Sequence, residues 1–248
     1  MRTAVLLAAF IVSSNAPAAD IKVLTAGAFK PVVVAVAAEF ERRSGHHLVI
    51  DNDTGGALAR RIAGGEKFDL VVLPKGALEQ LAVSGKVDDA TPLARVGIGV
   101  AVKRGAALPD IGSVAAFRRA LLEARAVAYI DPAAGGSSGI YLAQLFDKMG
   151  IAAQIKSKAV LVPGGLVAQK VVDGAADLGV HQISEILSVP GAVLAGPIPA
   201  ELQNYTDYAG GVSAAAHDPA AARALLLILG EEGARKAMQT RGMEALNK

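Results

Sequence analysis

The chain has no cysteine and no tryptophan, and only 4% of its 248 residues are aromatic. Without cysteine it can form no disulfide, no thiolate metal site and no lipid anchor through a modified cysteine. It also lacks an excess of one charge, because 25 Lys and Arg against 23 Asp and Glu leave a formal net charge of +2. No global field therefore recruits nucleic acid or a membrane surface, and any recognition of charge has to be local.

Long apolar runs are confined to the start of the chain. Arg2 precedes an apolar stretch at 4–12, and Ala16-Pro17-Ala18 follows as a small-residue cleavage pattern, which is typical of a cleavable signal peptide. We expect residues 1–19 to be removed and the mature chain to work in the periplasm. No later run reaches the ~18 uncharged apolar residues of a membrane helix, so no stable membrane insertion is expected after cleavage.

The chain is rich in small aliphatic residues, and 52% of it is hydrophobic. Apolar strand-like runs alternate with amphipathic helix-like runs, which predicts an α/β protein with largely parallel sheets. We expect strands at 21–24, 48–51, 68–73, 95–103, 127–130, 159–162, 178–181 and 205–216. We expect helices at 31–43, 58–63, 76–84, 113–124, 138–149 and 166–173, and two more within 219–240.

The pattern breaks near residue 95 and again near residue 205. These breaks predict two lobes joined by two crossings of the chain. Residues 20–97 and 206–248 would form lobe 1, and residues 98–205 would form lobe 2. Each lobe would hold a mixed sheet flanked by helices, with a cleft between the lobes.

Gly, Ser or Thr occurs where an extended run gives way to a helical one in four places, at 25–30, 53–57, 132–139 and 163–166. A helix start exposes unpaired N–H groups and partial positive charge, so several of them facing one cleft would bind an anion. The glycine-rich stretch 135–139 lacks the lysine of a nucleotide-binding P-loop. No group of His, Asp and Glu has ligand spacing, so we expect no metal and no cofactor.

Five stretches carry a resemblance to a known family, in order along nearly the whole mature chain: Ala26-Gly27-Ala28-Phe29, Thr54-Gly55-Gly56-Ala57-Leu58-Ala59-Arg60-Arg61-Ile62, Phe68-Asp69-Leu70-Val71-Val72, Ser138-Gly139-Ile140-Tyr141 and Asp177-Leu178-Gly179-Val180. The chain resembles periplasmic solute-binding proteins of the molybdate-binding type. The resemblance implies a two-lobed periplasmic-binding-protein-like fold (type II), hinge closure on a small anion and delivery to an ABC permease. We expect a monomer.

The resemblance also implies site positions, and the chain departs from the family at two of them. Molybdate binders hold their oxyanion with neutral donors, and the matching positions here are Ala28, Thr54 or Gly55, Ser138, Gly164 or Gly165, and Gln182. The first hydroxyl is thus missing, and an amide stands where the family has a tyrosine. Lys30 and Lys75 follow strands of lobe 1, and a full positive charge suits carboxylates. An organic carboxylate is therefore favoured over a molybdate-like oxyanion.

A second resemblance is to periplasmic aconitate isomerase, which implies proton transfer on a tricarboxylate. His181, at a strand end facing the expected cleft, is the candidate base; the alternatives are a hydrogen bond within the strand end or a side chain turned toward solvent. Solute binding for ABC uptake is the first hypothesis and the isomerase is the alternative. The expected ligand-binding residues are Ala28, Phe29, Lys30, Thr54, Gly55, Gly56, Lys75, Ser137, Ser138, Gly139, Gly164, Gly165, His181 and Gln182.

Overall fold

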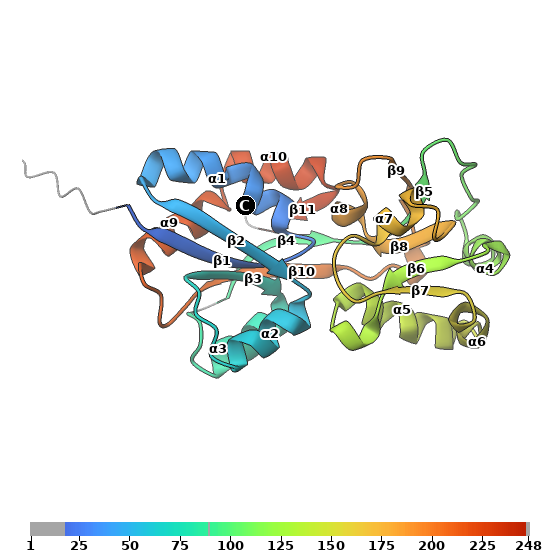
Figure 1. Cartoon of the computed structure of the whole chain (residues 1–248), viewed down its shortest axis with the longest axis horizontal. Helices are drawn as coiled ribbons and strands as arrows, with labels where there is room; N and C mark the ends of the chain where they lie inside the picture. The colour runs from blue at the N-terminus through green and yellow to red at the C-terminus, as the bar shows by residue number, and fades with distance from the viewer. Residues whose placement is uncertain (1–17, 89, 247–248) are drawn as a thin grey trace, which may run out of the picture.

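The computed structural model describes residues 18–88 and 90–246, and it consists of two lobes side by side along the long axis (Figure 1). Residues 1–17 of the expected signal peptide lie outside the described part. Within the described part, no helix is long and apolar enough to cross a membrane.

A six-stranded sheet forms the centre of the first lobe, with the strand order β11-β4-β10-β3-β1-β2. Strands β1, β2 and β3 are parallel to one another, whereas β10 and β11 run antiparallel to their neighbours. The strands are β1 (Asp20–Ala26), β2 (His47–Asp53), β3 (Leu70–Pro74), β4 (Thr91–Val96), β10 (Thr206–Val212) and β11 (Met243–Ala245).

A five-stranded sheet forms the centre of the second lobe, with the strand order β7-β6-β8-β5-β9. Strands β6, β7 and β8 are parallel, and β5 pairs antiparallel with both β8 and β9. The strands are β5 (Ile98–Lys103), β6 (Val127–Ile130), β7 (Ala159–Val162), β8 (Leu178–Gln182) and β9 (Ala192–Pro197). Two mixed sheets with flanking helices confirm the predicted fold class.

Helices cover both faces of the first sheet (Figure 1). On one face lie α1 (Lys30–Ser44), α9 (Pro219–Ile228) and α10 (Glu232–Thr240), and on the other α2 (Gly55–Ala63) and α3 (Lys75–Val83). Helix α1 buries Val33, Val36 and Phe40 at helical spacing. It ends at Ser44, and Gly45 caps it in the left-handed conformation (φ 75°), which glycine adopts without steric cost. The two helical layers close two separate apolar clusters over the sheet.

The second sheet is covered in the same way. Helices α4 (Val114–Glu123), α5 (Ser137–Lys148) and α6 (Ala152–Lys156) close the larger apolar cluster. Helices α7 (Val167–Val172) and α8 (Ile183–Ile186) close two smaller clusters on the opposite face. Two 3₁₀ turns, η1 (Pro132–Ala134) and η2 (Ala200–Leu202), complete the lobe.

Two segments of chain cross between the lobes, and a side chain joins them. Strand β4 ends at Val96 and β5 begins at Ile98, so the chain changes sheets at Gly97. On the return crossing, Gln203 accepts a hydrogen bond from the Ile98 N–H at 2.8 Å and donates one to the Ile98 carbonyl at 2.9 Å. The two crossings therefore lie side by side, and we call this junction at Gly97, Ile98 and Gln203 the hinge.

Several expectations about the elements were wrong. The run 95–103, predicted as one strand that crosses into the second lobe, makes that crossing as two strands separated by Gly97. The strand predicted at 205–216 ends at Val212, and α6, α8 and β11 were not predicted. Strand β9 was not predicted, because Pro190, Pro197 and Pro199 break the apolar pattern around it. Pro197 is tolerated there because β9 is an edge strand: one of its sides has no neighbouring strand, so a residue without an N–H need not break a hydrogen bond of the sheet.

Candidate functional site

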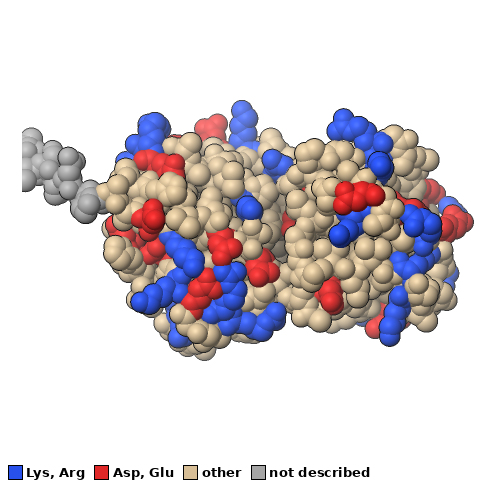
Figure 2. Space-filling view, viewed as in Figure 1, with Lys and Arg blue, Asp and Glu red and all other residues tan. Residues whose placement is uncertain are grey.

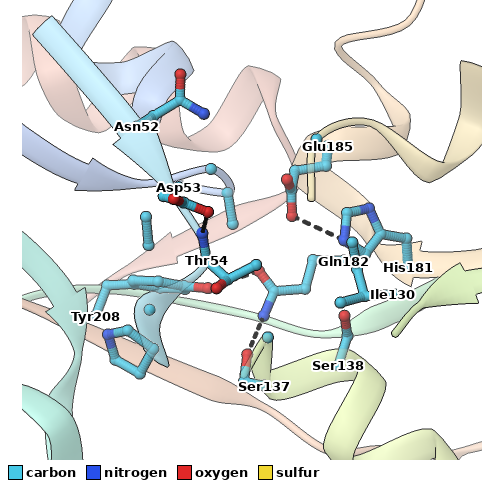
Figure 3. Close-up of a pocket in the computed structure, with 17 residues that line it drawn as sticks. Asn52, Asp53, Thr54, Ile130, Ser137, Ser138, His181, Gln182, Glu185 and Tyr208 are labelled. Atoms are coloured by element: carbon cyan, nitrogen blue, oxygen red, sulfur yellow. Dashed lines mark hydrogen bonds and ion pairs between the residues drawn. The ribbon is translucent and has the colours of Figure 1, made fainter. Parts of the chain in front are cut away.

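A cavity lies between the two lobes, where the carboxyl ends of both sets of parallel strands meet. Its volume is about 40 Å³ in this arrangement of the lobes. The first lobe contributes Ala26, Gly27, Ala28, Asn52, Asp53, Thr54, Gly55, Pro74 and Tyr208, and the second contributes Ile130, Gly136, Ser137, Ser138, Gly165, His181, Gln182 and Glu185 (Figure 3).

The start of helix α5 presents donors to this cavity. Ser137 and Ser138 are the first two residues of the helix, and both line the cavity. The first N–H groups of a helix have no acceptor within the helix, so they remain available to a ligand. Gly139 lets the helix begin so close to β6, because a Cβ there would lie 2.3 Å from the Ile130 carbonyl oxygen.

Thr54 caps helix α2 and also joins the lobes. Its hydroxyl accepts from the Ala57 N–H at 3.1 Å and donates to the Ala134 carbonyl at 2.6 Å. The Gly56 N–H donates to the Gly135 carbonyl at 3.0 Å beside it. We call these two contacts across the cleft, from Thr54 and Gly56, the latch. The Thr54 hydroxyl proton is used in this contact, so Thr54 helps to hold the lobes together and its hydroxyl is not a free donor for a ligand.

Four polar side chains from both lobes meet at one end of the cavity. Tyr208 donates to the Gln182 Oε1 at 2.7 Å, and the Gln182 Nε2 donates to Ser137 at 2.9 Å and to Thr206 at 3.1 Å. Gln182 and Tyr208 are each only 2% exposed. Burial and the nearby Glu185 raise the pKa of the Tyr208 phenol well above its usual range, so Tyr208 stays protonated.

His181 and Glu185 form a buried pair on the second lobe's side of the cavity. The His181 Nε2 lies 3.1 Å from the Glu185 Oε2 (Figure 3). Burial raises the pKa of Glu185 to about 8 and lowers that of His181 to about 3. Both shifts favour the uncharged forms, so near neutral pH the pair holds one proton on the carboxyl and the imidazole is neutral.

The other carboxylate of the cavity lies in a different electrostatic environment. The Asp53 Oδ1 accepts from the Thr54 N–H at 2.7 Å, and its Oδ2 lies 3.7 Å from Arg61. Glu185 has no Lys or Arg within ion-pair distance in the described chain, and the His181 Nδ1 is buried without a hydrogen-bond partner. The raised pKa of about 8 means that the protonation of Glu185 changes near neutral pH.

The structure brings eight of the expected site residues together in the cavity lining: Ala28, Thr54, Gly55, Ser137, Ser138, Gly165, His181 and Gln182. It does not place the other six there, namely Phe29, Lys30, Gly56, Lys75, Gly139 and Gly164. Phe29 is fully buried in the first lobe's core. The two glycines that pack against neighbouring backbone, Gly56 and Gly139, act through close approach instead.

The expected role of the lysines needs correction. Lys30 is not itself in the lining, but its ammonium donates to the Oδ1 of the lining residue Asn52 at 2.7 Å. Lys75 lies 3.7 Å from Glu79, one helical turn further along α3. Neither of them, and no Arg, lines the cavity among the described residues. Charges of both signs are instead mixed over the visible surface (Figure 2). Any anion bound in this cavity would therefore have to meet neutral donors, in a lining that also holds Asp53 and Glu185.

Several lining residues escaped the sequence reasoning. Glu185 follows His181 by four residues, at the start of a helix after a strand, and that spacing was the available signal. Tyr208 had no such signal, because the antiparallel pairing of β10 with β3 sets it opposite Pro74. Among the described residues, no three His, Asp or Glu lie close enough together to hold a metal ion.

The model of the bacterial extracellular solute-binding protein family matches residues 21–244. This chain belongs to that family. The solute-binding protein also shares its fold with the periplasmic molybdate-binding protein of Azotobacter vinelandii, with a TM-score of 0.71 and 18% identity over 90% of this chain and 98% of that one. The sulfate-binding protein SubI of Mycobacterium tuberculosis gives a TM-score of 0.72 and 18% identity over 92% and 88%.

A curated relative is nearer in sequence. The aconitate isomerase of a Pseudomonas species is 35% identical over 249 aligned positions, which cover 97% of this chain and 94% of that enzyme. The match extends over both lobes, so it includes every element that lines the cavity.

A Gly56→Ala variant should destabilise the closed arrangement. The added Cβ would lie 2.9 Å from Gly135, and overpacking of this kind costs about 1–3 kcal/mol. Gly76→Ala is the matched control, because Gly76 is also the second residue of a nine-residue helix and has nothing within 4 Å. Small-angle X-ray scattering should give a larger radius of gyration for G56A alone. Identical scattering from the two variants would show that the glycine contact does not limit closure.

Glu185→Gln should flatten the pH dependence of stability. Between the unfolded pKa near 4.5 and the folded pKa of about 8, the native state holds a proton that the unfolded chain releases. The free energy of unfolding therefore falls as pH rises through that window, by at most about 1.4 kcal/mol per pH unit for one proton.

Urea unfolding between pH 6.5 and 8 measures this slope without interference from His181. The lowered pKa of His181 produces the opposite slope, but only between about 3 and 6.5. E185Q should gain stability relative to wild type across the measured window, and the exposed control Glu79→Gln should not. Parallel curves for wild type and E185Q would contradict the assignment.

Proposed function

We propose that this protein is an isomerase that moves the carbon–carbon double bond of an unsaturated tricarboxylate, aconitate, by proton transfer. The observation that carries the proposal is the buried carboxyl of Glu185, which lines the cavity with a pKa raised to about 8 beside a neutral imidazole. The 35% identity with a Pseudomonas aconitate isomerase supports it. A protein that only binds an anion has no need of a proton acceptor in its ligand cavity.

The reaction requires one proton to leave carbon and one to return. The ionised Glu185 takes a proton from the methylene carbon, and the electron pair of that C–H bond spreads over the three-carbon unit. Return of a proton to the former vinyl carbon leaves the double bond shifted by one position. General-base catalysis of this kind is most effective when the pKa of the base lies near the working pH, and burial puts Glu185 in that range.

Glu185 is a better base than His181, which we had expected in this role. The lowered pKa of about 3 makes the His181 imidazole a weak proton acceptor, and its Nε2 faces Glu185 rather than open space. We assign His181 to orientation of the carboxyl. The carboxylates of the substrate would be held by Ser137, Ser138 and the N–H groups at the start of α5, which are neutral donors for developing negative charge.

Proton NMR of cis-aconitate and trans-aconitate tests the proposal directly. Wild-type protein should interconvert them, and Glu185→Gln should lower the rate by about a hundredfold or more, as removal of a general base does. Glu79→Gln, an exposed glutamate outside the cavity, should leave the rate unchanged. No interconversion by wild-type protein at high concentration would eliminate the isomerase.

The pH profile provides a second measurement on the same samples. Because the base has to be ionised, kcat/KM should rise about tenfold per pH unit below the pKa of about 8 and level off above it. A rate that instead falls as pH rises from 6 to 8 would show that the protonated carboxyl is the active form.

Solute capture for uptake is the second candidate, and the latch between the lobes favours it. Contacts from both lobes that close over a ligand would shift an open protein to a closed one, the mode of a binding protein that delivers its ligand to an ABC permease. In either function we propose a monomer with lobe boundaries near residues 97 and 205, exported to the periplasm by cleavage of residues 1–19.

Thermal shift with a panel of anions separates the two candidates, because a ligand that binds only the folded state raises its melting temperature. The panel is molybdate, tungstate, sulfate, citrate and both aconitates. The isomerase predicts a shift with the tricarboxylates. A large shift with molybdate or sulfate alone, together with no isomerisation, would favour uptake of an inorganic oxyanion.

A further inference from the structure

The polar cluster at the end of the cavity is not explained by proton transfer. Gln182 and Ser137 come from the second lobe, and Thr206 and Tyr208 come from strand β10 beside the hinge. Gln182, Tyr208 and Thr206 are at most 8% exposed. Buried polar groups of this kind need complete hydrogen bonding, so the direction of each bond can be worked out from its neighbours.

The amide of Gln182 determines those directions. Its Oε1 accepts the single hydroxyl proton of Tyr208, and its two N–H groups go to Ser137 and Thr206. The opposite orientation of the amide would turn the carbonyl oxygen toward the two hydroxyls. It would leave the Tyr208 proton without that acceptor and one N–H without a partner. The observed orientation satisfies every group of the amide, so it is the favoured one.

The hydroxyl of Ser137 is left as a donor. Its oxygen accepts from the Gln182 Nε2 at 2.9 Å and from the Thr206 hydroxyl at 3.3 Å. A serine oxygen has two acceptor positions and one proton, so only the proton remains. Ser137 lines the cavity, and the Tyr208 oxygen is the nearby protein acceptor for that proton. Whether its partner is the Tyr208 oxygen or a ligand in the cavity, the Ser137 hydroxyl acts as the donor.

We propose that Gln182 is a positioning residue for anion binding: held by Tyr208 and Thr206, it makes the Ser137 hydroxyl an obligatory donor to an anion in the cavity. The ligand thus receives a hydrogen bond through the chain Tyr208, Gln182, Ser137. This arrangement explains how a cavity lined by two carboxylates, with no Lys or Arg in its described lining, selects an anion. It rests on the proposed function for the identity and the negative charge of the ligand.

The test is a double-mutant cycle of Tyr208→Phe and Ser137→Ala, read by isothermal titration calorimetry. The probe is propane-1,2,3-tricarboxylate, a saturated tricarboxylate with no double bond to move. Ser137→Ala should weaken binding by about tenfold, the loss expected for one hydrogen bond to a charged group. Tyr208→Phe should weaken it by about fivefold in the wild-type background, because the amide is then free to turn and accept from Ser137.

The decisive comparison is the effect of Tyr208→Phe on affinity in the wild type and in the S137A variant. If Tyr208 acts through Ser137, the Tyr208→Phe change should have no further effect on affinity in S137A. Independent fivefold and tenfold losses that multiply would show a direct contact of Tyr208 with the ligand and would overturn the proposal. Tyr141→Phe is the matched control, because it loses a 2.7 Å hydrogen bond to the Leu202 carbonyl away from the cavity lining. It should bind as wild type does.

Two provisions keep the test decisive. If Y208F does not fold, Thr206→Val replaces it in the same cycle, because it removes both the second acceptor of the amide and the donor to Ser137. If wild type does not bind the tricarboxylate, the cycle is run with sulfate or molybdate. Failure of isomerisation with an intact cycle would remove the isomerase alone. Absence of binding to all three anions would overturn the inference itself.

Discussion

The carboxyl group of Glu185 packs against the main chain of Gly27 across the cleft, and the chemistry of the cavity depends on this contact. A Cβ on Gly27 would lie 2.6 Å from the Glu185 Oε1, so only glycine lets the second lobe bring its carboxyl so close to the first. The contact helps to remove the carboxyl from water, and the imidazole beside it is neutral. Desolvation then raises its pKa into the range where it exchanges protons near neutral pH.

The rest of the site follows from two sheets whose parallel strands end at the same gap. Loops at the carboxyl ends of parallel strands are the usual ligand positions of open α/β sheets. Here the hinge at Ile98 and Gln203 brings two such edges face to face, and the latch of Thr54 and Gly56 closes them. The two proposed roles, proton transfer and anion binding, would then involve different groups, because Glu185 lies against Gly27 and the amide of Gln182 lies beside the hinge.

Sequence reasoning predicted the elements well where a periodic pattern was strong. The strands at 127–130 and 159–162 and the helix around Val33 and Phe40 are where the pattern put them. It did not predict β9, because prolines interrupt the apolar pattern of this edge strand. It also did not predict the break at Gly97, where one apolar run forms strands of two different sheets. In the site it found the glycine and serine turns, since backbone donors at helix starts depend on local sequence. It misplaced Lys30 and Lys75, because a long flexible side chain can turn either toward a cleft or toward a nearby polar group.

The sequence by itself determined the alternation of strands and helices, the absence of cysteine chemistry and the small-residue turns at the helix starts, all of which depend on near neighbours in the chain. The tertiary structure alone decided which side chains line the cavity. The antiparallel pairing of β10 with β3 brings Tyr208 to the cavity, and the pKa of Glu185 is raised because the folded lobes bury it. Both effects arise between residues far apart in the chain, so no local pattern carries them.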